Sequence, residues 1–534
     1  MAVRAIRQLD LFVGACLMVC FAKILLLPLL LALAACSVAP LKERSADVSL
    51  SQEDILQTRL GQIAQVYGQE HPGFSGVYPL NNPLDAFAAR IFLARAAEKT
   101  LDVQYYIWRK DLTGTMLLHE LYQAAERGVR VRLLLDDLGI ADLDDWLAML
   151  NSHPNIEVRL FNPFPLRQAR MLGFITDFSR VNRRMHNKLF TVDQSVTIAG
   201  GRNVGDEYFA ATDEVLFADL DVMAVGPAAV AASEDFDGYW ASQSSYPVDQ
   251  LFQQKSDILS LQNEVDKILA RPESAQYATS LRQTSFAQRM LAKELEMDWV
   301  HTRLVSDDPA KGMGPVDKSG LMIYSLEAMM GQSIRKLDLV SSYFVPTDAG
   351  VEVFSAMAGQ GTQIRILTNA LEATDVAAVH SGYAKHRKAL LKSGIELYEM
   401  KSQAPAGDNG AGGFSYGSGN GGFGSSGSSL HAKTFSVNGK QIYIGSFNFD
   451  PRSAELNTES GFVIDSTAMA DAVDKMFIER VPHTAYQVKL DEKGNVYWLE
   501  QGDPPVIYHR EPGTTWLKRA MVKFMSWLPI EWLL

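Results

Sequence analysis

Two short motifs with identical spacing contain the residues best suited to chemistry. The first motif comprises His186-Asn187-Lys188, Asp193, Gly200-Gly201 and Asn203. The second motif comprises His431-Ala432-Lys433, Asn438, Gly445-Ser446 and Asn448 at the same intervals. A lone His-x-Lys pair carries little information, but a repeated and spaced train of residues is far less probable by chance. We therefore expect His186 and His431 to be functional, and the other eight histidines to be structural.

These residue types suit phosphoryl transfer. Ammonium and amide groups can hold the oxygens of a phosphate, and here they come from Lys188, Lys433, Asn203 and Asn448. One imidazole can attack phosphorus while the other protonates the leaving oxygen. Two histidines among two lysines are a poor metal site, because ammonium groups disfavour a dication. We expect no metal and no cofactor.

A catalytic histidine needs an acceptor for its second ring nitrogen. Candidate carboxylates follow each motif, Asp219 in the first half of the chain and Glu459 in the second. Asp221 competes with Asp219, and the pairing of carboxylates with histidines stays open.

The same order of elements precedes each motif. Residues 101–108 and 129–135 have strand character and flank a helical pattern at 116–127. Residues 337–345, 351–358 and 364–367 repeat that order. Strand–helix–strand order with short turns predicts an α/β fold of two similar lobes. We expect each His-x-Lys to lie on a strand, with both side chains on one face.

The domain boundaries follow from these patterns. We predict a leader at 1–35, a helical lead-in at 36–72, lobe one at 73–248, a helical connector at 249–315 and lobe two at 316–480. A Gly/Ser-rich loop at 406–429 interrupts lobe two, and a tail occupies 481–534.

Residues 1–35 are predicted to be an export signal. An apolar stretch from Leu11 ends in Leu33-Ala34-Ala35-Cys36, which resembles a bacterial lipobox with Cys36 as the lipidated residue. The alternative is an uncleaved membrane-spanning helix. The chain starts at Met1 or at Met18. All three cysteines lie within the first 36 residues, so no disulfide framework is possible beyond them.

Charge gives a further restriction on function. The whole chain has a net charge of −12, and the part beyond residue 35 has 47 basic against 61 acidic residues. An acidic surface is a poor partner for a nucleic-acid backbone. We expect no nucleic-acid partner.

The duplicated His-x-Lys-x4-Asp pattern with Gly-Gly/Ser-x-Asn resembles the phospholipase D superfamily. The resemblance implies two lobes of mixed sheet and helices, related by a pseudo-twofold axis and sharing one active site. It also implies a covalent phosphohistidine intermediate, with His186 as the nucleophile and His431 as the general acid and base. The resemblance further implies that Asp193 supports the site, and that Asn438, which stands where the motif has Asp, can keep most of the hydrogen bonds of that Asp.

A finer resemblance concerns residues 101–108, 176–188, 200–203 and 528–531. These segments look like the bacterial cardiolipin synthase C family. The resemblance implies transfer of a phosphatidyl group from phosphatidylethanolamine to phosphatidylglycerol. Alternatives are a phospholipase D-type hydrolase, an exported nuclease and a non-catalytic scaffold.

Two features are compatible with a lipid substrate. The tail from Trp516 to Leu534 has apolar residues at helical spacing and three tryptophans, as in a helix at a membrane interface. A helix docked on the protein body would show the same pattern. Arg180, Arg183 and Arg184 precede the first motif and are candidates for steering anionic head groups toward the pocket. The alternative is that they form surface ion pairs. We expect a membrane-anchored protein on the periplasmic face, at the inner or the outer membrane.

Overall fold

The computed structural model describes residues 41–42, 44, 49–140, 142–212, 216–252, 258–330, 333–374, 376–402 and 428–534. The predicted leader, Cys36 and most of the Gly/Ser-rich loop lie outside these ranges. Within them, no helix is long and apolar enough to cross a membrane.

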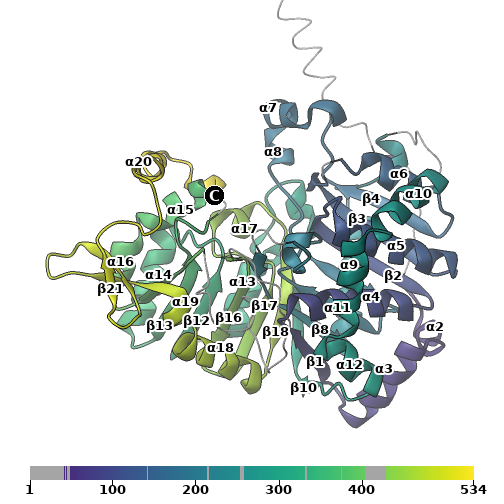
Figure 1. Cartoon of the computed structure of the whole chain (residues 1–534), viewed down its shortest axis with the longest axis horizontal. Coiled ribbons are helices and arrows are strands. Elements are labelled where there is room, and N and C mark those ends of the chain that lie inside the picture. Colours follow the sequence, from purple (N-terminus) through teal and green to yellow (C-terminus); the bar gives the residue numbers. More distant parts are fainter. Residues whose placement is uncertain are drawn as a thin grey trace, which may run out of the picture.

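The first lobe is built on a nine-stranded mixed sheet (Figure 1). Its spatial order is β10 (Asp298–Val300), β1 (Ser75–Leu80), β8 (Asp221–Val225), β6 (Val196–Gly200), β5 (Leu189–Val192), β2 (Thr100–Ile107), β3 (Arg130–Gly139), β4 (Ile156–Phe161) and β9 (Ser245–Pro247). Strands β2, β3 and β4 are parallel to one another, and the other neighbours are antiparallel.

The second lobe contains a ten-stranded sheet. Its order is β11 (Thr302–Ser306), β18 (Ser460–Ile464), β17 (Gln441–Gly445), β16 (Lys433–Val437), β12 (Lys336–Ser341), β13 (Gln363–Asn369), β14 (Glu396–Met400), β19 (Ala485–Leu490), β20 (Val496–Glu500) and β21 (Val506–Tyr508). From β18 to β19 the order and direction of the strands repeat those from β8 to β9. The predicted α/β duplication is confirmed.

A buried ion pair also recurs at equivalent places in the two lobes. The Arg132 guanidinium lies 2.6 Å from Asp102 across β2 and β3, and Arg365 lies 2.6 Å from Asp338 across β12 and β13. Both pairs join neighbouring parallel strands at matched register. The internal repeat therefore extends to individual side-chain contacts.

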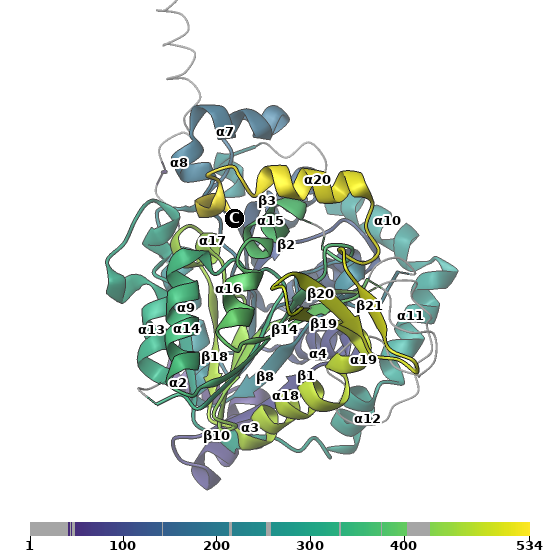
Figure 2. The ribbon, with the colours of Figure 1, turned by 90° about the vertical axis from the view of Figure 1, so that its left-hand side faces the viewer.

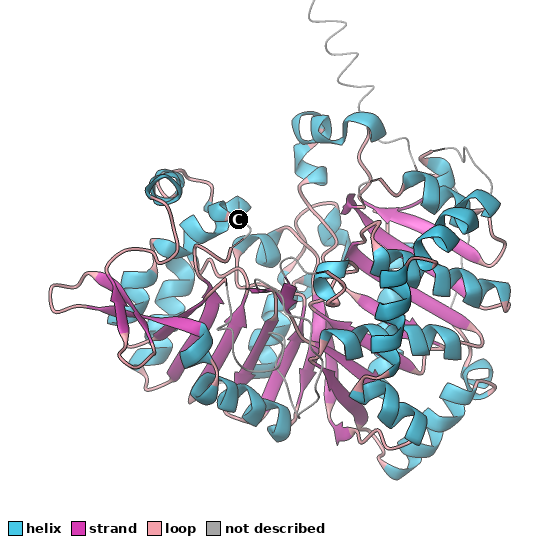
Figure 3. Cartoon of the chain, in the orientation of Figure 1, coloured by secondary structure: helices cyan, strands magenta, loops and turns pink. Residues whose placement is uncertain are grey.

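Helices flank both sheets (Figure 3). In the first half of the chain they are α2 (Gln52–Leu56), α3 (Arg59–Glu70), α4 (Pro83–Ala96), α5 (Leu112–Glu126), α6 (Asp144–Asn151), η1 (Arg167–Leu172), α7 (Gly173–Thr176), α8 (Phe178–Val181), η2 (Asp206–Tyr208) and α9 (Pro227–Ala241). The next are η3 (Val248–Gln250), α10 (Ile258–Leu269), α11 (Pro272–Arg282), α12 (Ser285–Ala292), η4 (Pro309–Gly312) and η5 (Lys318–Gly320). Lobe two and the tail contain α13 (Met322–Met330), α14 (Thr347–Gly359), α15 (Ala377–Ala384), α16 (Arg387–Lys392), α17 (Pro451–Glu455), α18 (Thr467–Glu479), α19 (Val481–Thr484), α20 (Trp516–Met525) and η6 (Glu531–Leu533).

The two sheets lie side by side (Figure 1) and share a hydrophobic core. Each lobe has an apolar cluster of its own. A further cluster joins Val222 and Phe236 of lobe one to Ile444 and Phe462 of lobe two. Burial of such side chains stabilises the folded chain by about 1.5–3 kcal/mol each. The lobes are therefore held together by apolar packing as well as by polar contacts.

Two predicted segments differ from the structure. The connector at 249–315 is helical only in part, because β10 and β11 follow α12 and add an edge strand to each sheet. The tail at 481–534 likewise contributes β19, β20 and β21 to the second sheet before it reaches α20. In both places pairing with a distant strand determines the conformation, and local patterning does not show it.

Candidate active site

The first His-x-Lys segment lies just before a strand, and the prediction that it lies on one is wrong. Strand β5 begins at Leu189, and His186 precedes it by three residues. The segment pairs with the opposite lobe instead. The amide of His186 donates to the Thr458 carbonyl at 2.9 Å, and the Thr458 amide donates to the Arg184 carbonyl at 2.9 Å.

The second His-x-Lys segment mirrors this arrangement. Lys433 is the first residue of β16, so His431 lies outside that strand. The preceding strand β15 (Ser428–Leu430) pairs in parallel with β7 (Leu216–Ala218) of lobe one. The His431 amide donates to the Ala218 carbonyl at 2.8 Å. Each histidine segment thus runs beside the carboxylate-bearing segment of the other lobe.

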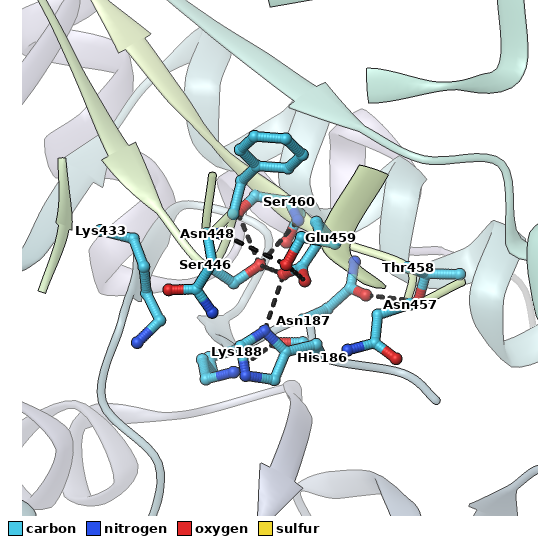
Figure 4. A network of polar contacts seen from close by, with 12 residues as sticks. His186, Asn187, Lys188, Lys433, Ser446, Asn448, Asn457, Thr458, Glu459 and Ser460 are labelled. Atoms are coloured by element: carbon cyan, nitrogen blue, oxygen red, sulfur yellow. Dashed lines mark hydrogen bonds and ion pairs between the residues drawn. The ribbon is translucent and has the colours of Figure 1, made fainter. Parts of the chain in front are cut away.

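This pairing crosses the carboxylates between the lobes. Glu459 of lobe two lies 2.8 Å from Nδ1 of His186 of lobe one (Figure 4). Asp219 of lobe one lies 2.5 Å from Nδ1 of His431 of lobe two. Each Nδ1 is thereby engaged, which leaves Nε2 of each ring for chemistry. The question that the sequence left open is answered by the placement of the two lobes.

Asp221 does not serve a histidine. Its carboxylate accepts from Arg90 at 2.9 Å and from the backbone amide of Arg202 at 3.1 Å. The Arg202 guanidinium lies 3.4 Å away. Asp221 therefore belongs to a buried structural ion-pair network beneath the site.

The two carboxylates differ in charge state. Glu459 is buried, and this burial raises its pKa to about 7, although Lys188 and the hydroxyls of Ser446 and Ser453 favour the ionised form. Asp219 is also buried, but His431, Lys433 and Arg202 together lower its pKa to about 2. Asp219 is thus fully ionised at neutral pH, whereas Glu459 is close to its midpoint.

The surroundings lower the pKa of both imidazoles. Burial lowers the pKa of His186 well below its usual range, and the nearby Lys188 and Lys433 lower it further. Burial and Lys433 also lower the pKa of His431, while Asp219 opposes this shift. An ionised partner makes His431 the better proton carrier of the two.

The two lysines are buried beside the histidines. Lys188 Nζ donates to the carbonyl of His186, and Lys433 Nζ donates to the carbonyl of His431 and to Ser342 Oγ at 3.0 Å. Burial lowers the pKa of Lys188 to about 7. These buried cations can hold the non-bridging oxygens of a phosphodiester, whose charge would in turn raise the lysine pKa.

A cavity of about 890 Å³ joins both halves of the site. Its wall includes the predicted residues His186, His431, Asn203 and Asn448. Asn203 is held by the Ile107 amide and the Tyr208 hydroxyl, and Asn448 accepts from Ser342 Oγ at 3.0 Å. The lining also contains residues that the sequence did not indicate, namely Tyr106, Arg109, Tyr208, Tyr343, Arg452, Leu533 and Leu534.

The Gly-Gly and Gly-Ser difference between the motifs also has a structural reason. A Cβ on Gly201 would lie 2.0 Å from Asp219 Oδ1, so only glycine allows this carboxylate its position. At the equivalent place in lobe two, Ser446 Oγ donates to Glu459 at 2.5 Å. Gly201 and Ser446 each lie 15 residues after the histidine of their motif. This difference is visible in the sequence and reflects the different surroundings of the two carboxylates.

Asp193 and Asn438 lie away from the histidines. Both occupy left-handed turns between paired strands, with φ of 49° and 56°. Asp193 accepts from the backbone amides of Glu98, Lys99 and Thr100 at the start of β2. Asn438 accepts from the amides of residues 335 and 336 and donates to the carbonyl of residue 333. The two residues therefore fix strands that carry the site, and an amide suffices at 438.

The three arginines before the first motif do not face the cavity as head-group ligands. Arg184 is buried against Asp136 at 3.0 Å, and Arg180 lies 2.7 Å from Asp177. Arg183 donates to carbonyls of Lys311 and Glu455. The cavity wall instead contains Arg109 and Arg452. Across the described ranges, no group of three His, Cys, Asp or Glu is placed to hold a metal ion.

Comparison with known proteins identifies relatives along most of the chain. The sequence profile of the family described as "Cardiolipin synthase, PLD-like domain" matches residues 91–240 and 326–481. Cardiolipin synthase C of Escherichia coli (strain K12) is 49% identical over 471 residues, covering 87% of this chain and 97% of that protein. An uncharacterized protein of Helicobacter pylori (strain J99 / ATCC 700824) is 32% identical, and the match covers 89% of this chain and 93% of that protein.

The fold also matches a solved structure. Phosphatidylserine synthase of Haemophilus influenzae Rd KW20 superposes with a TM-score of 0.54 at 14% identity. The match covers 88% of this chain and all of that one. At this identity the likeness concerns the arrangement of the two lobes alone.

Proposed function

Because the chain belongs to the PLD-like cardiolipin synthase family, we propose that it transfers a phosphatidyl group between phospholipids to make cardiolipin. The observation that supports this most strongly is the pair of histidines on one cavity wall, each oriented by a carboxylate of the opposite lobe. The donor is phosphatidylethanolamine and the acceptor is phosphatidylglycerol.

In the first step His186 attacks phosphorus of the donor. Its Nε2 forms the new P–N bond while the P–O bond to ethanolamine breaks. His431 gives its Nε2 proton to the departing oxygen, and Asp219 stabilises the imidazolium before this transfer. Lys188 and Lys433 hold the phosphate oxygens in both steps, with Asn203 and Asn448 beside them.

In the second step the acceptor restores the enzyme. A glycerol hydroxyl of phosphatidylglycerol gives its proton to His431, and its oxygen attacks phosphorus. The P–N bond to His186 breaks, and cardiolipin leaves. Water in place of that hydroxyl would give phosphatidic acid, so access of the acceptor to the cavity distinguishes the transferase from a hydrolase.

The cellular setting belongs to the same proposal. Cys36 would be the lipid attachment site after removal of residues 1–35, which would anchor the body at the periplasmic face of a bacterial membrane. Its substrates would then lie in the membrane to which it is anchored. Supporting this setting are the lipobox-like sequence Leu33-Ala34-Ala35-Cys36 and the lipid chemistry proposed above.

Expression in cells that lack cardiolipin tests the function. Lipid mass spectrometry should detect cardiolipin with the native chain and none with His186→Ala or His431→Ala. Asp221→Asn is the matched control at the same depth, because the Asp221 carboxylate pairs with Arg90 and Arg202 and with neither histidine. Phosphatidic acid without cardiolipin would show a hydrolase instead, and unchanged lipids with all variants folded would refute the proposal.

A further inference from the structure

Two segments from different lobes expose large apolar side chains at one end of the molecule. The lobe-one prong comprises residues 167–181, which form η1, α7 and α8. The lobe-two prong comprises residues 516–533, which form α20 and η6. Figures 1 and 2 both place α7, α8 and α20 at the same end. The exposed apolar residues are Met171, Leu172, Ile175 and Phe178 in the first prong, and Trp516, Leu517, Met521, Phe524, Trp527, Leu528 and Trp532 in the second.

The exposure of α20 distinguishes between the two interpretations that its sequence allows, a helix at a membrane interface and a helix docked on the protein body. A helix docked on the body would bury its apolar face. In α20 only Val522 is buried, while Trp516 is 72% exposed and Phe524 is 60% exposed. The apolar face therefore points into solvent, as does Ile175 of the other prong at 77% exposure.

The charge of α20 favours an anionic surface as its partner. The helix contains Lys518, Arg519 and Lys523 and no acidic residue, although the whole chain has a net charge of −12. Lys523 Nζ also lies 5.9 Å from the Trp527 ring centre. Cations beside exposed tryptophans are typical of a helix that lies in the headgroup region of an anionic bilayer.

Both prongs are attached to the wall of the active-site cavity. Arg452, a wall residue, donates to Asn182 at the end of α8 at 2.6 Å and to the Leu533 carbonyl of η6 at 3.0 Å. Helix α20 packs on α15, which contributes Val379 to the same wall. Phe178 and Trp532 meet edge to face with ring centres 6.4 Å apart, so the prongs contact each other.

We infer that the two prongs form one docking surface for an anionic phospholipid bilayer, with the cavity between the lobes beside it. The inference rests on the proposed function, since a phospholipid substrate explains why such a surface adjoins the cavity. Docking on both lobes orients the cavity toward the lipid headgroups. A phospholipid then reaches His186 and His431 without full transfer into water, which its apolar chains would oppose.

Quenching by brominated acyl chains tests the docking itself. The full-length protein is reconstituted in vesicles of phosphatidylcholine and phosphatidylglycerol, with bromine on the acyl chains. Tryptophan fluorescence should be quenched, and Trp516→Phe with Trp527→Phe should remove most of the quenching. Equal quenching in that double variant, or none in the native chain, would overturn the inference and point to a protein partner for this surface.

Activity on two physical forms of substrate tests the consequence. Ile175→Glu and Phe524→Glu should each lower the rate on vesicles by roughly tenfold, because each places a charge where an apolar side chain meets lipid. Both should keep the rate on short-chain phospholipids dispersed as monomers. The matched control is Ile63→Glu on α3, which is 53% exposed at the other end. Equal rates on vesicles for all three variants would refute the inference.

The two experiments fail independently. If brominated lipids quench the native protein but no lipid is transferred in any form, the docking stands and the proposed function is wrong. If short-chain lipids are transferred while vesicle quenching is absent, the proposed function stands and the docking is wrong.

Discussion

Asp219 and Glu459 give the two histidines different tasks. Asp219 is ionised, with a pKa lowered to about 2 by His431, Lys433 and Arg202 against the effect of burial, whereas burial raises the pKa of Glu459 to about 7. The histidine beside the permanent charge is the better proton donor, and the neutral His186 is the better nucleophile. This asymmetry supports the role of each residue in the proposed mechanism.

At this scale Asp219 and Asp221 are an informative pair for mutation. Asp219→Asn should lower kcat by roughly 10²- to 10⁴-fold, because the amide no longer stabilises the imidazolium of His431. Asp221→Asn should keep kcat and lower stability by about 3 kcal/mol, because it weakens the buried contacts of Arg90 and Arg202. Steady-state kinetics and urea unfolding of both variants check this. Loss of kcat in Asp221→Asn alone would contradict the assignment.

The pH dependence of the reaction rate follows from the charge states of Glu459 and Lys188. Glu459 becomes ionised, and able to accept from His186, as pH rises through about 7. Lys188 loses its charge as pH rises through about 7. We therefore expect kcat/KM to peak near neutral pH and to fall on both sides. In Glu459→Gln the decline toward acidic pH should disappear at a lower overall rate, and an unchanged profile would argue against this role.

At the scale of elements, the site depends on hairpin turns that support it from a distance. Asp193 and Asn438 fix the start of β2 and of β12 through backbone amides. Substitution of Asn438 by Asp should keep the two accepted bonds and lose the one donated to Ser333. We expect a loss of about 1 kcal/mol in stability with kcat unchanged. Thermal unfolding and kinetics of the purified variant measure both quantities, and a large fall in kcat would place Asn438 closer to the chemistry than the structure does.

The elements also show which parts of the fold and the site could be predicted from the sequence. The sequence predicted the repeated strands at 101–108 and 337–345, their helices and the candidate residues, because period and spacing are local properties. The crossed pairing of the histidines was not readable, because His431 meets Asp219 where β15 joins β7, and His186 meets Glu459 where residue 185 meets residue 458. Likewise the sequence did not predict that Tyr106 and Arg452 line the cavity, because neither residue belongs to the repeated motif.

At the scale of the whole molecule, the lobes form one unit because the site and a hydrophobic core span both. We expect a single unfolding transition for the described body. Hydrogen exchange should report equal opening free energies for β5 of lobe one and β16 of lobe two. Two separate transitions, with either lobe stable alone, would contradict this coupling.

The most direct test of the account is the identity of the covalent intermediate. The His431→Ala protein is mixed with a phosphatidyl donor that has a nitrophenol leaving group, which needs no general acid to depart. Peptide mass spectrometry should then find the phosphatidyl group on His186, because the second step lacks its base. Attachment to another residue, or steady turnover of lipid in this variant with no adduct at His186, would contradict the mechanism.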